Sequence, residues 1–172
     1  MQNNDIIEKL ITLHGNDVLR IATAYTRNPT ISEDIFQEVF IKVSKNIHKF
    51  KGESSERTWI IKITINTCKD YLKSAWNKKV ISIENTKEES KDTLFEENVI
   101  NKEKANNIVK EILNLSVKYK EVILLYYYQN FSTAEIAKIL SIPEASVRTR
   151  MKRAREMLKE KVQIILEEER GV

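Results

Sequence analysis

The sequence predicts an all-α protein built from two small helical domains. Only three glycines and two prolines occur among the 172 residues, about 3% of the chain where an average protein has about 12%. Sheets and tight turns need these residues for positive φ angles and preset turn geometry. Apolar side chains instead recur three and four residues apart, which is the period of amphipathic helices. A β-sandwich, a doubly wound sheet and a glycine-rich phosphate loop are therefore nearly excluded.

The distribution of charge places an acidic segment between two basic ones. Residues 42–79 contain ten Lys or Arg and three acids, and residues 141–161 contain seven Lys or Arg and three acids. Residues 84–98 contain six acids and two lysines. Within an overall net charge of +4, this pattern predicts two surfaces that meet a polyanion and a connecting segment that does not.

The N-terminal domain is expected over residues 1–77 and contains three helices. The first spans residues 5–27 and ends at Asn28, because the residue before a proline is disfavoured in helical geometry. The second helix follows at once, with Thr30 and Glu33 at the spacing of a capping box. A short polar stretch then separates it from the third helix.

The third predicted helix, residues 56–76, is rich in β-branched residues, so a strand competes for part of it. Helix is favoured because an apolar face and a polar stripe both repeat at helical spacing. The apolar face consists of Trp59, Ile60, Ile63, Thr67 and Tyr71. The polar stripe consists of Lys62, Asn66, Lys69 and Lys73. Lysines beside aromatic rings suit single-stranded DNA, although burial of the rings in a core explains the pattern at least as well.

Helical periodicity fades and acids accumulate over residues 78–98, which are predicted to form a flexible acidic linker. The C-terminal domain is expected over residues 99–172. Its predicted helices span residues 99–114, a segment capped by Ser116 that runs to about residue 129, residues 133–140, and a last helix from about residue 144.

The strongest motif lies in residues 132–158. Ser132 and Glu135 have the spacing of a capping box, and Pro143 closes a three-residue turn between a short helix and a longer basic one. This is the layout of a helix-turn-helix, whose second helix enters the major groove of DNA. The outer, base-reading face of that helix is expected to carry Ser146, Arg148, Thr149, Lys152 and Arg153.

The inner face of the same helix is expected to pack on the short helix before it. Its apolar members are Val147, Met151, Ala154 and Leu158, and their expected partners are Ile136, Ala137 and Leu140. Arg150 and Arg155 lie nearer this inner face. We expect these two arginines to contact phosphate or to pair with an acid on the neighbouring helix.

No constellation of residues predicts an enzyme, a metal site or a cofactor. Cys68 is the only cysteine and is expected to be a small buried residue, while His14 and His48 have no ligand partners at metal-binding spacing. No nucleotide-binding loop or nucleophile motif occurs. The chain has no signal-peptide pattern and no apolar run near the ~20 residues that cross a bilayer, so a cytoplasmic protein is expected.

Three stretches resemble the conserved regions of bacterial sigma factors. Residues 32–43, SEDIFQEVFIKV, resemble the second region, and residues 58–73, TWIIKITINTCKDYLK, resemble the promoter-melting part that follows. Residues 118–158, with YKEVILL, EIAKIL and SVRTRMKRAR in order, resemble the fourth region. With two modules and a short linker, the chain is similar to extracytoplasmic-function (ECF) sigma factors over nearly its whole length.

This resemblance implies an alternative sigma factor that binds core RNA polymerase and directs promoter-specific transcription initiation. Contact with the clamp helices of the polymerase β′ subunit is implied for Asp34, Gln37, Glu38 and Ile41, which otherwise read as a solvated helix face. Capture of the −10 element is implied for Phe50, Lys51, Lys62, Asn66 and Lys69. Recognition of the −35 element is implied for the outer face of the helix-turn-helix, where Ser146 stands in place of the usual threonine.

Further partners follow from the same resemblance. The β flap is the second implied polymerase contact, and an anti-sigma factor, often membrane-anchored, is the implied regulator. Two other functions remain open: a stand-alone helix-turn-helix regulator that binds a palindrome as a dimer, and a helical adaptor with no nucleic-acid role. The regulator would bind DNA without polymerase, and the adaptor would tolerate alanine at Arg148 and Lys152.

Overall fold

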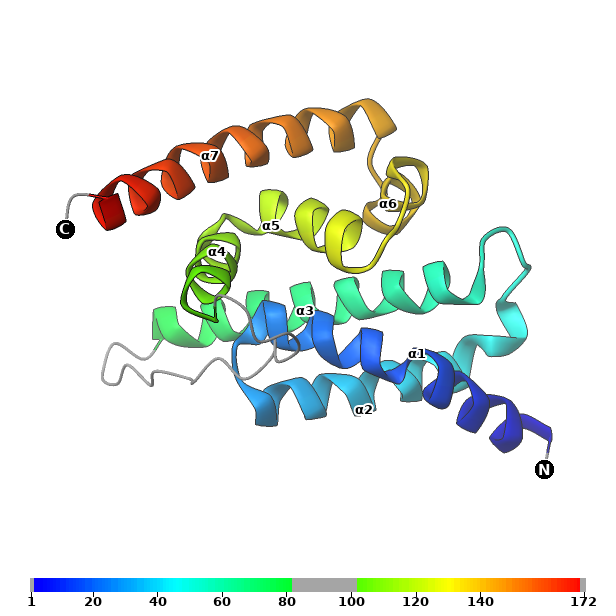
Figure 1. Ribbon diagram of the computed structural model, residues 1–172. Helices are drawn as coiled ribbons and strands as arrows, with labels where there is room; N and C mark the ends of the chain where they lie inside the picture. Colours follow the sequence, from blue (N-terminus) through cyan, green and yellow to red (C-terminus); the bar gives the residue numbers. More distant parts are fainter. Residues whose placement is uncertain (1, 82–101, 171–172) are drawn as a thin grey trace. The chain divides into compact units, whose positions relative to one another are not determined.

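The computed structural model describes residues 2–81 and 102–170, and within these ranges the chain is helical and contains no strand (Figure 1). It divides into two compact units, Met1–Leu94 and Phe95–Val172. The predicted all-α fold with two helical domains is confirmed. Residues 78–81 of the predicted linker belong to the third helix, and residues 82–98 lie outside the described residues.

The first unit is a bundle of three helices: α1 (Gln2–Thr26), α2 (Pro29–Asn46) and α3 (Glu56–Ile81). A single 3₁₀ turn, η1 (Ile47–Lys49), follows α2. Each helix packs against the other two. The fully buried side chains at the centre include Leu10, Val18, Val39, Val43, Ile60, Ile61 and Ile65, and Cys68 is buried as expected. An ion pair between Arg57 Nε and Asp17 Oδ2, 2.8 Å long, joins α3 to α1 at its edge.

The start of α2 differs from the prediction. Asn28 is the N-cap, and its Oδ1 accepts a hydrogen bond from the Ile31 backbone N–H at 3.1 Å. Pro29 takes the first helical position, which suits proline because its φ is already helical and it has no N–H to leave unpaired. The predicted capping box of Thr30 and Glu33 is therefore wrong, since the helix begins before it.

The third helix is helical throughout, which excludes the competing strand, but its buried face differs from the prediction. Ile60, Ile61, Thr64, Ile65, Thr67 and Cys68 are buried. Trp59, Ile63 and Tyr71 are only half-buried. Because β-branched residues occur on almost every side of α3, their periodicity does not select a face. Packing against both α1 and α2 selects it instead.

The second unit contains α4 (Lys102–Asn114), α5 (Val117–Ile123), a π-helical turn η2 (Leu124–Tyr128), α6 (Thr133–Leu140) and α7 (Glu144–Arg170). Ser116 stands at the N-cap of α5, although its side chain makes no capping hydrogen bond. The core of this unit is formed by Val122, Ile123, Leu125, Ile136, Ile139, Val147 and Ala154. No helix among the described residues is long and apolar enough to span a membrane.

Candidate nucleic-acid interface

Local sequence chemistry sets the geometry of the helix-turn-helix. The Ser132 hydroxyl accepts a hydrogen bond from the Glu135 backbone N–H at 3.2 Å, and Glu135 Oε2 accepts one from the Ser132 backbone N–H at 2.8 Å. This confirms the capping box and starts α6 at Thr133. Ser141 ends α6 in the left-handed conformation with φ of 54°, and α7 begins directly after Pro143.

The inner face of α7 is buried as predicted. Val147, Met151 and Ala154 are at most 3% exposed, while Leu158 is half-buried. On α6 the buried residues are Ile136 and Ile139, whereas Ala137 and Leu140, which were expected to pack on α7, are half-buried. The contact between α6 and α7 therefore fixes which side of α7 faces solvent.

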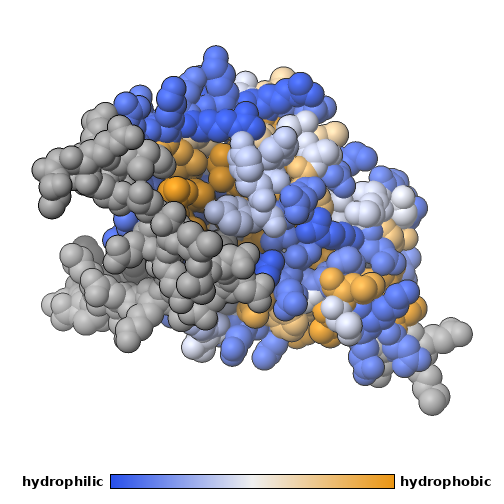
Figure 2. Space-filling model, viewed as in Figure 1, coloured by the Kyte–Doolittle hydropathy of each residue, from blue (hydrophilic) through white to orange (hydrophobic). Residues whose placement is uncertain are grey.

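The outer face of α7 presents cationic and hydroxyl groups. Arg148, Thr149, Lys152 and Arg153 are exposed and Ser146 is half-buried. The described part of this helix lies along the top of the view in Figure 2, where the surface is mostly hydrophilic. The Thr149 hydroxyl donates to the Ala145 carbonyl at 2.9 Å, and Arg148 Nη2 donates to Glu144 Oε1 at 2.8 Å. The structure thus places all five predicted residues on one helix, with Arg148 already paired.

The arginines nearer the inner face are anchored within the unit. Arg150 Nη1 donates to Glu121 Oε1 at 3.1 Å, and the side chain of Glu121 is only 2% exposed. Arg150 therefore pairs with an acid on a neighbouring helix, as predicted. Arg155 Nε instead donates to the Tyr127 hydroxyl at 2.9 Å, so the partner in this contact is a tyrosine and not the expected acid. These bonds hold α7 against α5 and η2 and fix the orientation of its outer face.

A groove of about 450 Å³ lies on the first unit between α2 and α3. It is lined by Lys42, Asn46, Lys49, Trp59, Ile63, Asn66 and Thr67. We call this the α2–α3 groove. Two lysines, two amides and one indole ring are the groups that bind phosphates and unstacked bases in single-stranded nucleic acid.

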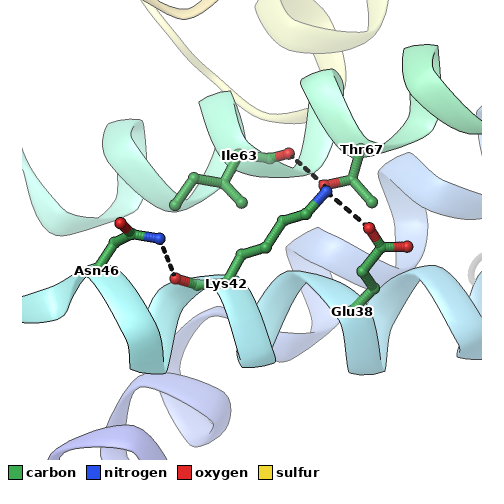
Figure 3. A network of polar contacts seen from close by, with 5 residues as sticks. All are labelled: Glu38, Lys42, Asn46, Ile63 and Thr67. Carbon is green, nitrogen blue, oxygen red and sulfur yellow. Dashed lines mark hydrogen bonds and ion pairs between the residues drawn. The ribbon is translucent and has the colours of Figure 1, made fainter.

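Polar contacts organise one wall of the groove (Figure 3). Lys42 Nζ lies 2.7 Å from Glu38 Oε1 and donates to the Thr67 hydroxyl at 3.1 Å. Thr67 in turn donates to the Ile63 carbonyl, and Asn46 Nδ2 donates to the Lys42 carbonyl. The ammonium of Lys42 is therefore held between two helices at the edge of the groove.

The residues predicted to capture the −10 element are only partly brought together. Asn66 lines the α2–α3 groove. Phe50 packs against Trp59, which also lines the groove, with the two rings tilted and their centroids 5.1 Å apart. Lys51 is exposed in the loop before α3, next to Gly52 at a φ of 71°. Lys62 and Lys69, half-buried on α3, do not line the groove.

The predicted polymerase-binding residues form one exposed face of α2. Asp34, Gln37, Glu38 and Ile41 are all exposed, and Ile41 is 53% exposed although it is apolar. Their spacing of three, four and seven residues puts them on one side of the helix. Glu38 belongs to this face and also pairs with Lys42, so the exposed face of α2 adjoins the α2–α3 groove.

A second groove, of about 400 Å³, lies on the second unit and is mainly apolar. It is lined by Ile112, Ile123, Tyr127, Tyr128, Arg155, Leu158 and Lys159. The π-helical turn explains why its tyrosines are accessible. The Gln129 N–H bonds to the Leu124 carbonyl, five residues back, and Tyr126, Tyr127 and Tyr128 are all at least 36% exposed.

Two protein-family models match the chain: Sigma-70 region 2 over residues 10–78 and Sigma-70 region 4 over residues 105–158. The ECF RNA polymerase sigma-E factor of Haemophilus influenzae is 32% identical over 166 residues, which cover 91% of this chain and 87% of that protein. The chain belongs to the ECF sigma factors. SigW of Bacillus subtilis is another relative, 28% identical over 93% of this sigma factor and 90% of its own length.

Solved structures agree with this sigma factor in fold. RpoE of Bartonella quintana, solved with the anti-sigma factor NepR, matches with a TM-score of 0.70 at 19% identity, over 93% of this chain and 98% of that one. CnrH, solved with the cytosolic domain of CnrY, matches with a TM-score of 0.68 at 18% identity, over 94% and 90% of the two chains. At such identities the likeness concerns the fold alone.

Two groove residues of this sigma factor, Lys42 and Asn46, were not predicted from the sequence. Both come from α2, yet they share a groove with α3. Their signal in the sequence was a spacing of four residues, which puts both on one side of a helix. Among the described residues, no group of three His, Cys, Asp or Glu could hold a metal ion.

Proposed function

We propose that this ECF sigma factor brings core RNA polymerase to its promoters through two DNA contacts, one in each unit. The outer face of α7 reads the −35 element as a duplex, and the α2–α3 groove takes an unpaired base of the −10 element. The observation that carries the proposal is the division of α7 into a buried apolar face and an exposed face with Arg148, Thr149, Lys152 and Arg153. The chain supplies sequence specificity, and the polymerase carries out the chemistry.

At the −35 element, the residues of α7 divide by chemistry. Arg148 and Lys152 can donate to guanine O6 and N7, and the Thr149 methyl can meet thymine. Ser146 suits a phosphate contact. Arg153 lies against Tyr119 of α5, and its hydrogen bond lowers the pKa of that hydroxyl, so we assign Arg153 to the edge of the interface.

At the −10 element, the α2–α3 groove offers each group that an unstacked base needs. Trp59 supplies a ring face for stacking, and Asn46 and Asn66 supply amides for the base edge. Lys42 and Lys49 lie where the phosphates of the same strand would run. Phe50 and Lys51 extend this surface into the loop before α3, while Lys62 and Lys69 follow the strand beyond the groove. Binding a separated base offsets the cost of unpairing it.

Core polymerase binding is assigned to a surface on each unit. We assign the exposed face of α2, with Asp34, Gln37, Glu38 and Ile41, to the clamp helices of β′, where Ile41 would supply an apolar centre and the other three residues a polar rim. The apolar groove beside η2 fits the β flap, since its lining resembles the hydrophobic groove that receives a helix from a partner.

Regulation and location complete the proposal. The two solved structures described above contain an anti-sigma factor or a cytosolic partner domain, which supports control of this chain by an anti-sigma factor, membrane-anchored in some families. We place the chain in the cytoplasm, where its polymerase is. We assign residues 1–81, which include all of α3, to the −10 domain, residues 82–98 to the acidic linker and residues 99–172 to the −35 domain.

Binding measurements distinguish this proposal from a stand-alone dimeric regulator. Electrophoretic mobility shift with a pool of promoter duplexes should show a specific complex only when core polymerase is added. A stand-alone regulator would select a palindrome with no polymerase present. Specific, palindromic binding by the purified chain alone would overturn the proposal.

A further inference from the structure

Glu144 joins both helices of the helix-turn-helix to an arginine of the base-reading face. Its Oε1 accepts a hydrogen bond from the Thr133 hydroxyl at 2.6 Å and one from Arg148 Nη2 at 2.8 Å. Thr133 is the first residue of α6 and Glu144 is the first residue of α7. One carboxylate oxygen therefore links the starts of both helices to Arg148, which follows one turn later on α7.

Arg148 retains most of its capacity to bind another group. Its side chain is 70% exposed, and the contact with Glu144 uses one of the five N–H donors of the guanidinium. The remaining donors suit the O6 and N7 atoms of guanine, which arginine recognises through two hydrogen bonds. An arginine held at one end has already lost part of the rotamer freedom that a free side chain gives up on binding.

The carboxylate of Glu144 has two opposite effects on DNA binding. Hydrogen bonds from Thr133 and Arg148 lower its pKa, so it stays ionised through the neutral range and forms a charge-assisted bond to the guanidinium. A carboxylate on the DNA-facing end of α7 also repels phosphates, which weakens binding to any sequence. The first effect favours one base, and the second opposes all DNA equally.

We propose that Glu144 is a specificity-determining residue of the −35 interface. Its carboxylate positions Arg148 to read a guanine and lowers the affinity for DNA of any sequence. Thr133 positions the carboxylate in turn. The inference rests on the proposed function, because it requires α7 to read −35 DNA. The alternative is a purely structural acid that stabilises the start of α7 through the helix dipole, which would leave base preference unchanged.

The test measures base preference and general affinity separately. Holoenzyme made with each variant is bound to linear promoter duplexes whose −35 positions are randomised, and bound and free DNA are sequenced. Arg148→Ala identifies the position that Arg148 reads. At that position Glu144→Gln should lower the preference for guanine about three- to tenfold, which is part of the discrimination that one bidentate pair supplies. Affinity for a duplex without a promoter should rise about twofold, as expected for loss of one exposed charge.

Matched variants separate positioning from charge and from folding. Glu156→Gln removes an exposed acid from the same helix and should leave base preference unchanged. Thr133→Val should reduce the same guanine preference without raising general affinity, whereas Thr133→Ser, which keeps the hydroxyl, should behave as the parent. Adding Glu144→Gln to Arg148→Ala should cause no further change in base preference at the position that Arg148 reads.

Two results would overturn the inference while leaving the proposed function intact. Unchanged guanine preference in Glu144→Gln would show that the ion pair does not position Arg148. An equal loss of preference at every −35 position would show that Glu144 acts on the fold of the unit. If the parent holoenzyme itself had no −35 preference, the proposed reading of DNA by α7 would fail instead.

Discussion

Replacing Lys42 by methionine should reduce the salt dependence of −10 binding by the holoenzyme. Methionine keeps the aliphatic stem and removes the ammonium, which in the free protein lies between Glu38 and Thr67 at the edge of the α2–α3 groove. The fold should tolerate the change. The ion pair lost with Lys42 joins residues four apart on one exposed helix face and is worth about 0.3–0.5 kcal/mol. The lost hydrogen bond contributes about 1 kcal/mol.

The expected size of the effect follows from counterion release. One phosphate contact on single-stranded DNA contributes about 0.7 to the slope of log affinity against log salt. Between 50 and 200 mM salt, the parent should therefore lose about 2.6 times more affinity than Lys42→Met. Lys49→Met should give a change of similar size, because Lys49 lines the same groove.

Fluorescence anisotropy with holoenzyme and a DNA carrying an unpaired −10 bubble measures these slopes. Lys45→Met is the matched control, since Lys45 is an exposed residue of α2 that does not line the groove. Its slope should equal that of the parent. Equal slopes for the parent, Lys42→Met and Lys49→Met would refute the assignment of the groove to the DNA strand.

Three further predictions concern stability and polymerase binding. Met151→Ala should lower the free energy of unfolding by about 2–5 kcal/mol in urea denaturation, because Met151 is buried at 3% exposure. Met157→Ala is the control: at a site that is 41% exposed, it should change the free energy of unfolding by about 0.5 kcal/mol or less. Ile41→Asp should weaken core polymerase binding about tenfold in competition assays, as expected for charge at an apolar interface centre. Burial lowers the pKa of His14, so stability should fall as pH drops from 7.5 to 5.5, and His14→Gln should reduce that fall.

Proton binding by His14 links the stability of the first unit to pH. His14 has a lower pKa in the folded protein than in the unfolded chain, so the unfolded chain takes up the proton first as pH falls. Thermal melts at both pH values for the parent and His14→Gln measure the difference. An identical loss of stability in the two proteins would contradict this expectation.

Leu13→Asp is the matched control for Ile41→Asp. Leu13 is 57% exposed on α1, so an aspartate there should leave polymerase binding unchanged.

Local chemistry in the sequence was sufficient to predict the helix-turn-helix. A capping box depends on two residues three positions apart, and Ser132 with Glu135 makes the expected bonds. The same reasoning failed at α2, because two overlapping caps competed there. Asn28 with Pro29 satisfies the first turn, and the later pair of Thr30 and Glu33 is left inside the helix.

Features that depend on packing between distant segments were harder to predict from the sequence. The α2–α3 groove joins Lys42 to Thr67 and Asn66, residues more than twenty positions apart that no local pattern links. The apolar groove of the second unit depends on a π-helical turn, which exposes three consecutive tyrosines where an α-helix would turn at least one inward. Helical spacing places Lys42 and Asn46 on one side of α2, but no pattern in the sequence links them to α3 or indicates the π-helical turn.

Run-off transcription shows whether this sigma factor gives core polymerase its choice of promoter. Purified core polymerase is incubated with a library of promoter fragments, with and without this sigma factor, and the 5′ ends of the transcripts are mapped. We expect transcripts with defined start sites that appear only when the chain is present. These starts should disappear with Arg148→Ala combined with Lys152→Ala. The absence of any promoter-specific transcript, or starts that are unaffected by the α7 variants, would contradict it.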